Sequence, residues 1–429
     1  MPTGVNTRIM IEGQHTAIHL EVRRQALMLS LRKAFEREVI ALTSRPPANE
    51  ALNAWLFTQI ARSHAAGIVA DGDEQLFVPL VAASDSVGAE GHDGAAWPLV
   101  KYLLRARARA GEPPDDQLVS TQAHEMDMWL REAWEERRSA LYADVQGDEV
   151  TSYTVVSERS ETGYAVELNP KPGGQLSRHS VNNACLEKLR SGFSGLEEEF
   201  DTRFFLLCHR YATLFGPHSS EGRGWQLATP PKAMDQLGTD FGVDAECFAS
   251  PFNRRHARFC SAFADTDVPF GSSGNFFASR RNGTLRTFSS AECGPPYDDA
   301  LMAMAIHMLD AELEQREEAS TPGTFVLVVP DWRFPTPSAF CQAFAASRFL
   351  THVESLGKDE HRYVEGFQHL ATGSKKKGKQ QEHRMQFVMG ETATLLVWLQ
   401  NEAGTKRHPV TRDAVERQRR AWNVGPLGP

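Results

Sequence analysis

The stretch that decides the fold reads GPPYDDALMAMAIHMLDAELEQREEASTPGTFVLVVP, residues 294–330. It begins with a rigid proline turn and continues as an amphipathic helix, with Asp298 and Asp299 at the helix start, where the helix dipole favours acids. It ends in the apolar run Phe325–Val329, which is typical of a buried strand. The order of turn, helix and strand predicts one unit of an α/β fold.

The sequence on both sides of this stretch repeats the alternation. Two short strands are predicted upstream, and a helix followed by an antiparallel hairpin is predicted downstream. The ranges are Glu246–Ser250, Thr284–Ser289, Ser338–Leu356, and the hairpin strands Arg384–Met389 and Thr392–Gln400. Together they predict a doubly wound α/β sheet that closes in a terminal antiparallel hairpin.

The rest of the chain predicts further parts. In Ala17–Leu42 an apolar residue recurs every four positions, as on one face of a packed helix. We therefore predict a mainly helical domain over residues 1–150. Residues 151–240 predict a hairpin followed by helices, residues 241–402 hold the predicted sheet, and residues 403–429 predict a charged C-terminal tail.

Length and charge bound the function. The chain has 429 residues, enough for two or three domains, and 46 Lys and Arg against 55 Asp and Glu, a net charge of −9. This balance excludes a domain that is basic over its whole surface, the simplest kind of nucleic-acid binder. No apolar run approaches the roughly 20 residues that span a bilayer, and no secretory signal is evident, so we expect an intracellular protein without a membrane segment.

The six cysteines are widely spaced. They include no C-x-x-C pair that would indicate a zinc ribbon or a redox site. We predict reduced thiols in the core and no metal site.

Three stretches follow predicted strands, where ligands bind in sheets of this kind. They are Ser250–Asn253, Asp265–Gly274 and Gly294–Tyr297. The second combines glycines, which allow close backbone approach, with two carboxylates that suit ribose hydroxyls. A turn or helix cap is the alternative for one of these carboxylates. The third is a rigid turn that carries an aromatic ring.

Six stretches in the second half occur in an order that one family shares. They are Glu246–Asn253, Cys260–Asp267, Phe270–Gly274, Val329–Arg333, Thr336–Pro337 and Ser347–Phe349. This part, from about Phe204 to about Gln400, resembles the family of the phosphorylated-CTD-interacting factor, the cap-specific adenosine N6-methyltransferase.

The resemblance implies a Rossmann-like class I methyltransferase sheet and S-adenosyl-L-methionine as methyl donor. The implied reaction is methylation of the N6 amine of the 2′-O-methylated adenosine next to the cap of mRNA, so residues 151–240 would support RNA and cap binding. The implied catalytic turn is Gly294, Pro295, Pro296 and Tyr297. The implied donor-binding residues are Pro251, Asn253, Asp267, Phe270, Gly271, Ser272 and Gly274.

Gly294 departs from the family, in which an Asn begins this turn and its side-chain oxygen accepts a hydrogen bond from the amine. Glycine has no side-chain acceptor, so one contact is lost unless another group supplies it. Three hypotheses follow. The chain is an active cap-adjacent methyltransferase, a weakened or inactive homologue that binds capped RNA, or a methyltransferase for a different RNA amine.

Two further groups of residues are candidates for contact with RNA. Trp332 and Arg333 end a predicted strand and are candidates for RNA or cap contact, with core packing as the alternative for Trp332. Lys375, Lys376, Lys377 and Lys379 form a basic run that suits RNA phosphates, with a solvated surface as the alternative. We find no WW module in the sequence, which argues against docking to the RNA polymerase II tail. Nuclear residence is implied by the substrate.

Overall fold

The computed structural model describes residues 4–9, 12–43, 49–69, 77–81, 97–111, 115–147, 152–171, 177–215, 223–366, 387–390 and 392–423. These residues form two compact units. The first unit holds the described residues up to 215, and the second holds those from 223 onward. The division into four parts that the sequence indicates stays a prediction.

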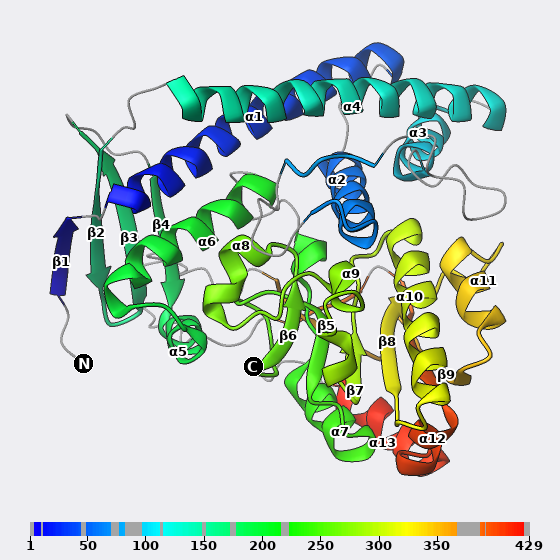
Figure 1. Ribbon diagram of the computed structural model, residues 1–429. Helices are drawn as coiled ribbons and strands as arrows, with labels where there is room; N and C mark the ends of the chain where they lie inside the picture. The colour runs from blue at the N-terminus through cyan, green and yellow to red at the C-terminus, as the bar shows by residue number, and fades with distance from the viewer. Residues whose placement is uncertain are drawn as a thin grey trace, which may run out of the picture. The chain divides into compact units, whose positions relative to one another are not determined.

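The first unit combines long helices with an antiparallel sheet (Figure 1). Its helices are α1 (Glu12–Thr43), α2 (Asn49–Ala65), α3 (Trp97–Ala110), α4 (Asp116–Gly147), α5 (Asn183–Gly192) and α6 (Phe200–Phe215), with the 3₁₀ turn η2 (Glu197–Glu199) before α6. The sheet order is β1 (Gly4–Ile9), β2 (Tyr153–Arg159), β3 (Gly163–Pro170) and β4 (Ser177–Asn182). The predicted helical region and the predicted hairpin are therefore confirmed.

The second unit is built on a mostly parallel sheet (Figure 1). Its strands are β5 (Ala245–Ala249), β6 (Arg258–Ser261), β7 (Ser290–Cys293), β8 (Thr324–Pro330), β9 (Leu350–Leu356) and β12 (Thr394–Gln400). The strand order is β6-β5-β7-β8-β12-β9, in which β12 runs antiparallel to both of its neighbours and the other pairs are parallel. The predicted mixed α/β fold with a mostly parallel sheet is confirmed.

Helices cover both faces of this sheet. On one face α7 (Pro231–Phe241) and α13 (Arg412–Trp422) enclose a core with Val326, Val328 and Trp398. Side chains alternate along a strand, so Phe325 points to the other face, where the guanidinium of Arg316 in α10 (Asp299–Glu318) lies 5.4 Å from its ring centroid. α10 contacts α11 (Ala339–Ala346) on that side.

Short elements complete the second unit. They are η3 (Arg223–Gln226), α8 (Ala264–Asp267), η4 (Val268–Phe270), α9 (Phe276–Ser279), η5 (Leu285–Thr287), α12 (Glu402–Arg407) and the two-stranded pair of β10 (Tyr363–Val364) with β11 (Phe387–Val388).

The prediction of a terminal hairpin was wrong. β12 pairs with β8 and β9, and β11 pairs with β10 in a separate sheet. All seven residues of β12 are buried, so this strand needs a neighbour on each side, and the interior position between β8 and β9 provides both. The short spacing between the two segments is typical of a hairpin, but the two strands do not pair with each other.

Two other element predictions were also wrong. Residues 284–289 contain the 3₁₀ turn η5 and not a strand, because Asn282 and Thr287 accept and donate local hydrogen bonds that close a turn; the strand begins at Ser290. The segment predicted as one helix over 338–356 is α11 followed by β9. Ser347 separates them, with an extended backbone and a side chain that bonds Asp310.

The expected charged tail folds onto the core. It forms α12 and α13, and the side chain of Trp422 is fully buried. The six cysteines are free and buried, as predicted. No helix among the described residues is long and apolar enough to cross a membrane, and the same residues contain no cluster of His, Cys, Asp or Glu that could hold a metal ion.

Candidate functional site

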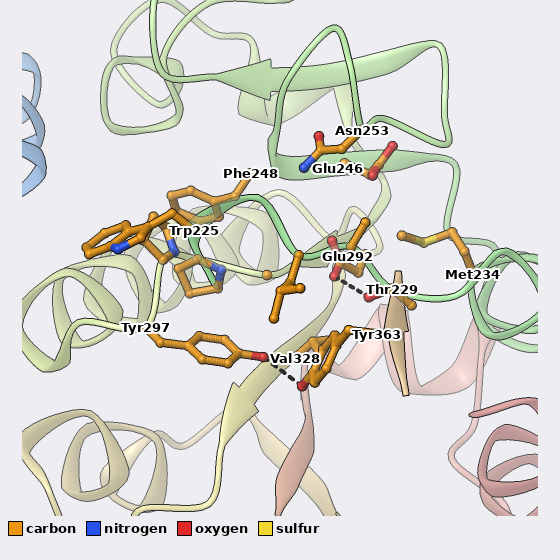
Figure 2. A pocket seen from close by; sticks show the side chains of 15 residues that line it. Trp225, Thr229, Met234, Glu246, Phe248, Asn253, Glu292, Tyr297, Val328 and Tyr363 are labelled. Atoms are coloured by element: carbon orange, nitrogen blue, oxygen red, sulfur yellow. Dashed lines mark hydrogen bonds between the residues drawn. The ribbon is translucent and has the colours of Figure 1, made fainter. Parts of the chain in front are cut away.

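A pocket opens in the second unit beside the carboxyl ends of β5, β7 and β8 (Figure 2). About 500 Å³ of space lies between its lining residues, open solvent included. Its lining combines aromatic rings, two carboxylates and the proline turn that follows β7. The lining residues are Trp225, Leu227, Ala228, Thr229, Met234, Glu246, Phe248, Asn253, Glu292, Gly294, Pro295, Pro296, Tyr297, Val328 and Tyr363.

The turn Gly294–Tyr297 is held rigidly between β7 and α10. Two consecutive prolines fix the backbone φ angle, and the Asp298 amide donates to the Pro296 carbonyl at 2.7 Å. Asp298 also caps α10 by accepting a hydrogen bond from the Leu301 amide at 3.1 Å. All four residues of the predicted catalytic turn therefore line the pocket, on a backbone that the start of a 20-residue helix anchors.

A chain of hydrogen bonds orients the ring of Tyr297. Its hydroxyl donates to the Tyr363 hydroxyl at 2.7 Å (Figure 2). The Tyr363 hydroxyl bonds in turn to the Thr394 hydroxyl. Thr394 lies 2.8 Å from Nε2 of His361, whose Nδ1 lies 2.8 Å from the Gly357 carbonyl. A carbonyl only accepts, so Nδ1 carries the proton and Nε2 accepts from Thr394. The hydroxyls of Tyr297, Tyr363 and Thr394 therefore all donate away from the pocket.

Burial keeps the groups of this hydrogen-bond network in their neutral forms. It lowers the pKa of His361, so the imidazole stays neutral at physiological pH. Burial also raises the pKa of Tyr297, and it raises that of Tyr363 to about 12. Because the hydroxyl of Tyr297 is bonded to Tyr363, the part of this side chain that the pocket presents to a ligand is the ring.

Removal of the Tyr363 hydroxyl should destabilise the protein. We expect Tyr363→Phe to lower the free energy of unfolding by about 1–3 kcal/mol, because the hydroxyl of the half-buried Tyr297 loses its acceptor. Urea denaturation of Tyr363→Phe, Tyr297→Phe and the double variant measures the coupling, which we expect to exceed about 0.5 kcal/mol. Strictly additive losses would show that the two hydroxyls do not interact.

Two buried glutamates lie side by side at the base of the pocket. Glu246 in β5 and Glu292 in β7 are register partners in the parallel sheet. Oε1 of Glu246 accepts the backbone amides of Arg255 and His256, each at 2.7 Å. Glu292 accepts the Thr229 hydroxyl at 3.1 Å (Figure 2). Burial, and then the negative charge of Glu246, raises the pKa of Glu292 to about 8.

The carboxyl group of Glu292 occupies the space beside Gly294. A Cβ atom built on Gly294 would lie 2.9 Å from Oε1 of Glu292, closer than real contacts allow. A side chain at position 294 therefore requires Glu292 to move. The carboxyl group of Glu292 can take this position because residue 294 has no side chain.

Among the predicted donor-binding residues, Asn253 lines the pocket directly. Its Oδ1 accepts the amide of Ser250 at 2.7 Å and its Nδ2 donates to the Gln226 carbonyl at 3.3 Å, so it ties the end of β5 to η3. Pro251 is buried in the same turn.

The other predicted donor-binding residues form a loop beside β6. Asp267 is fully buried, and its oxygens accept hydrogen bonds from the Thr266 hydroxyl at 2.9 Å and the Phe263 amide at 3.4 Å. Gly271 and Gly274 both adopt a φ of 93°, which favours glycine, and the Gly274 carbonyl accepts the Ser261 amide at 2.9 Å. Phe270 and Ser272 are buried within this loop, which lies outside the lining of the pocket.

The candidate RNA residues lie elsewhere. Trp332 packs edge-on against Phe340 with ring centroids 5.7 Å apart, and Arg333 pairs with Asp331 through two hydrogen bonds of 2.7 and 2.8 Å. Neither residue lines the pocket. Lys375, Lys376, Lys377 and Lys379 lie outside the described residues.

Several lining residues were missed by the sequence analysis, among them Trp225, Phe248 and Tyr363. They lie far from the turn in sequence, and only folding brings them to it. Glu246 and Glu292 did carry a signal, because an acidic residue inside an apolar strand is unusual unless it has a role.

Comparisons with known proteins agree with the resemblance. Residues 188–366 match the family described as Phosphorylated CTD interacting factor 1 WW domain. The mRNA (2′-O-methyladenosine-N(6)-)-methyltransferase of Homo sapiens is 33% identical over 219 residues, 51% of this chain and 28% of the human protein. The Mus musculus protein of the same name is 34% identical over 207 residues, 48% of this chain and 27% of the mouse protein. The chain thus spans less than a third of the length of these relatives.

Proposed function

Because residues 188–366 belong to the family of the phosphorylated-CTD-interacting factor, we propose that this chain is an RNA methyltransferase acting on the N6 amine of the 2′-O-methylated adenosine next to the mRNA cap. The observation that carries the proposal is the turn Gly294–Tyr297, which lines a pocket at the carboxyl ends of parallel strands. The sheet order, with one antiparallel strand between β8 and β9, supports a Rossmann-like class I methyltransferase fold.

We propose S-adenosyl-L-methionine as the methyl donor, which supplies an electrophilic methyl group when bound. The loop beside β6 fits a donor at one point, because a Cβ atom on the buried Gly274 would meet no atom within 4 Å and the backbone there is open to close approach. Asn253 and the loop containing Gly271 and Gly274 would hold the donor. Asp267, whose oxygens bond within the loop, would act by shaping it.

The residues of the pocket suit an adenine amine. Such an amine is a poor nucleophile because its lone pair is delocalised into the ring, so the site must orient it and accept its hydrogens. On the family resemblance, the carbonyl of Pro295, which lines the pocket, would be one acceptor. The ring of Tyr297 offers a stacking surface for the base, as is usual for single-stranded RNA, and Phe248 and Trp225 extend the apolar lining.

Donor binding tests the proposed donor site. Calorimetry should detect S-adenosylmethionine binding to the wild-type chain and none to Gly274→Trp. Gly283→Trp is the matched control, because Gly283 also has a positive φ of 82° with open space around it and lies outside the pocket and its loop. Equal binding by both variants would refute the placement of the donor.

The alternatives differ in measurable ways. A weakened homologue would bind capped RNA and donor without turnover, and an enzyme for another amine would methylate RNA at a different position.

The expected absence of a WW module stays a prediction, although the description of the matched family names that domain. We propose a nuclear location on the same description. A pull-down with phosphorylated and unphosphorylated tail peptides tests whether the chain docks to the polymerase tail, as that description suggests, or does not, as the expected absence of a WW module implies.

A further inference from the structure

The pocket supplies a polar group where the turn lacks one. Gly294 has no side chain, yet the oxygen Oε1 of Glu292 lies 2.9 Å from the point where a Cβ atom would stand. The space that a longer residue would fill at the start of the turn therefore belongs to a carboxyl group of the preceding strand. Both residues line the same pocket.

We propose that Glu292, as a neutral carboxylic acid, recognises the target adenine, its carbonyl oxygen accepting a hydrogen of the N6 amine and its hydroxyl donating to the adjacent ring nitrogen. This inference rests on the proposed function and names the group that selects the base. Adenine presents a donor beside an acceptor at its amine-bearing edge, and a neutral carboxylic acid presents the complementary pair. An ionised carboxylate presents acceptors only and would face the lone pair of the ring nitrogen.

The surroundings of Glu292 hold it in place. Its side chain leaves β7 toward the pocket, where Thr229 donates to Oε1 at 3.1 Å and the Gly294 amide gives a backbone hydrogen bond. Glu246, its register partner, keeps its own Oε1 on the amides of Arg255 and His256. The two acids therefore have different roles: Glu246 fixes the loop after β5, and Glu292 faces the pocket.

Burial and Glu246 favour the neutral form of Glu292, and their effect exceeds that of the hydrogen bonds from Thr229 and Gly294, which favour the ionised form. Burial raises the pKa of Glu292, and the negative charge of Glu246 in β5 raises it further, to about 8. Burial raises the pKa of Cys247 and Cys293, and also that of Tyr297 and Tyr363, so these groups stay neutral near pH 7. Among these groups Glu292 alone changes charge close to pH 8.

The first test is a pH profile of methyl transfer to capped RNA that begins with 2′-O-methyladenosine. Wild-type activity should fall as the pH rises through about 8. Glu292→Leu should lose about 5- to 150-fold, the effect of leaving one buried partner unmade. Glu292→Gln presents the same acceptor and a donor at all pH values, so it should restore most of the loss and remove the decline above pH 8.

Base analogues supply a second readout that needs no turnover. Fluorescence anisotropy without methyl donor should show weaker binding, by about 5-fold or more, for a capped oligonucleotide in which the first adenine lacks the ring nitrogen that Glu292 contacts. The 1-deaza and 7-deaza analogues test the two nitrogens that flank the amine edge, each serving as the control for the other. The difference between the analogues should disappear in Glu292→Leu.

The outcomes separate this inference from the proposed function. If wild-type protein methylates no capped RNA, the proposed function fails. If wild-type protein is active but Glu292→Gln is as impaired as Glu292→Leu, an ionised carboxylate is required and the inference is wrong. If Glu292→Leu keeps full activity, or if neither analogue alters wild-type binding, Glu292 does not contact the base and the inference is also wrong.

Discussion

Replacing Trp422 with alanine is expected to lower the free energy of unfolding of the second unit by about 3–5 kcal/mol. The indole is fully buried near the end of α13, with ring centroids 5.5 Å from Tyr363 and 6.0 Å from His361. Its removal leaves a cavity under the two residues that orient Tyr297. The substitution should therefore disturb the pocket as well as the core.

Denaturant unfolding of the second unit, followed by fluorescence, measures this effect. Arg420→Ala is a suitable control because Arg420 is exposed on the same helix, and we expect it to change stability by less than about 0.5 kcal/mol. A loss below about 1 kcal/mol in Trp422→Ala would show that α13 does not belong to the core.

The second large effect concerns Glu292. We expect Glu292→Gln to unfold less readily than the wild type at pH 7, by roughly 3 kcal/mol. The folded pKa is about 8 against an ordinary value of 4.5, so the unfolded wild-type chain ionises first and binds fewer protons. Wild-type stability therefore falls as the pH rises from 4.5 to 8, by about 1.4 kcal/mol for each pH unit.

Glutamine cannot ionise, so its advantage should vanish near pH 4.5 and reach its full size above pH 8. Unfolding measured from pH 4.5 to 8.5 tests this dependence. Glu314→Gln, at an exposed position on α10, should track the wild type throughout. Equal stability of Glu292→Gln and wild type at pH 8 would mean that Glu292 ionises normally in the folded protein.

The sequence predicted those parts of the fold whose signals are local. The apolar run of β8 and the acidic start of α10 lie within single elements, and both predictions were confirmed. The partners of β12 could not be predicted, because a strand that is buried on both faces does not specify which neighbours it takes. The burial of Trp422 was missed since the charged residues around it on α13 indicate an exposed helix.

The same distinction applies to the site. The turn Gly294–Tyr297 was predicted because its four residues are consecutive and follow a strand. The hydrogen-bond chain from Tyr297 to His361 joins three separate segments, and the pairing of Glu246 with Glu292 depends on the register of two strands. Such contacts arise only in the folded chain. The carboxyl group of Glu292 beside Gly294 is also seen only in the folded chain.

The most direct test of the central proposal is mass spectrometry of cap nucleosides. The purified chain is incubated with S-adenosylmethionine and a capped RNA that begins with 2′-O-methyladenosine, and the RNA is then digested. We predict a product 14 mass units heavier at the cap-adjacent adenosine, with the added methyl group on N6, and none with the Tyr297→Ala variant. Unmodified cap-adjacent adenosine from wild-type protein that binds both the RNA and the donor would contradict the proposal.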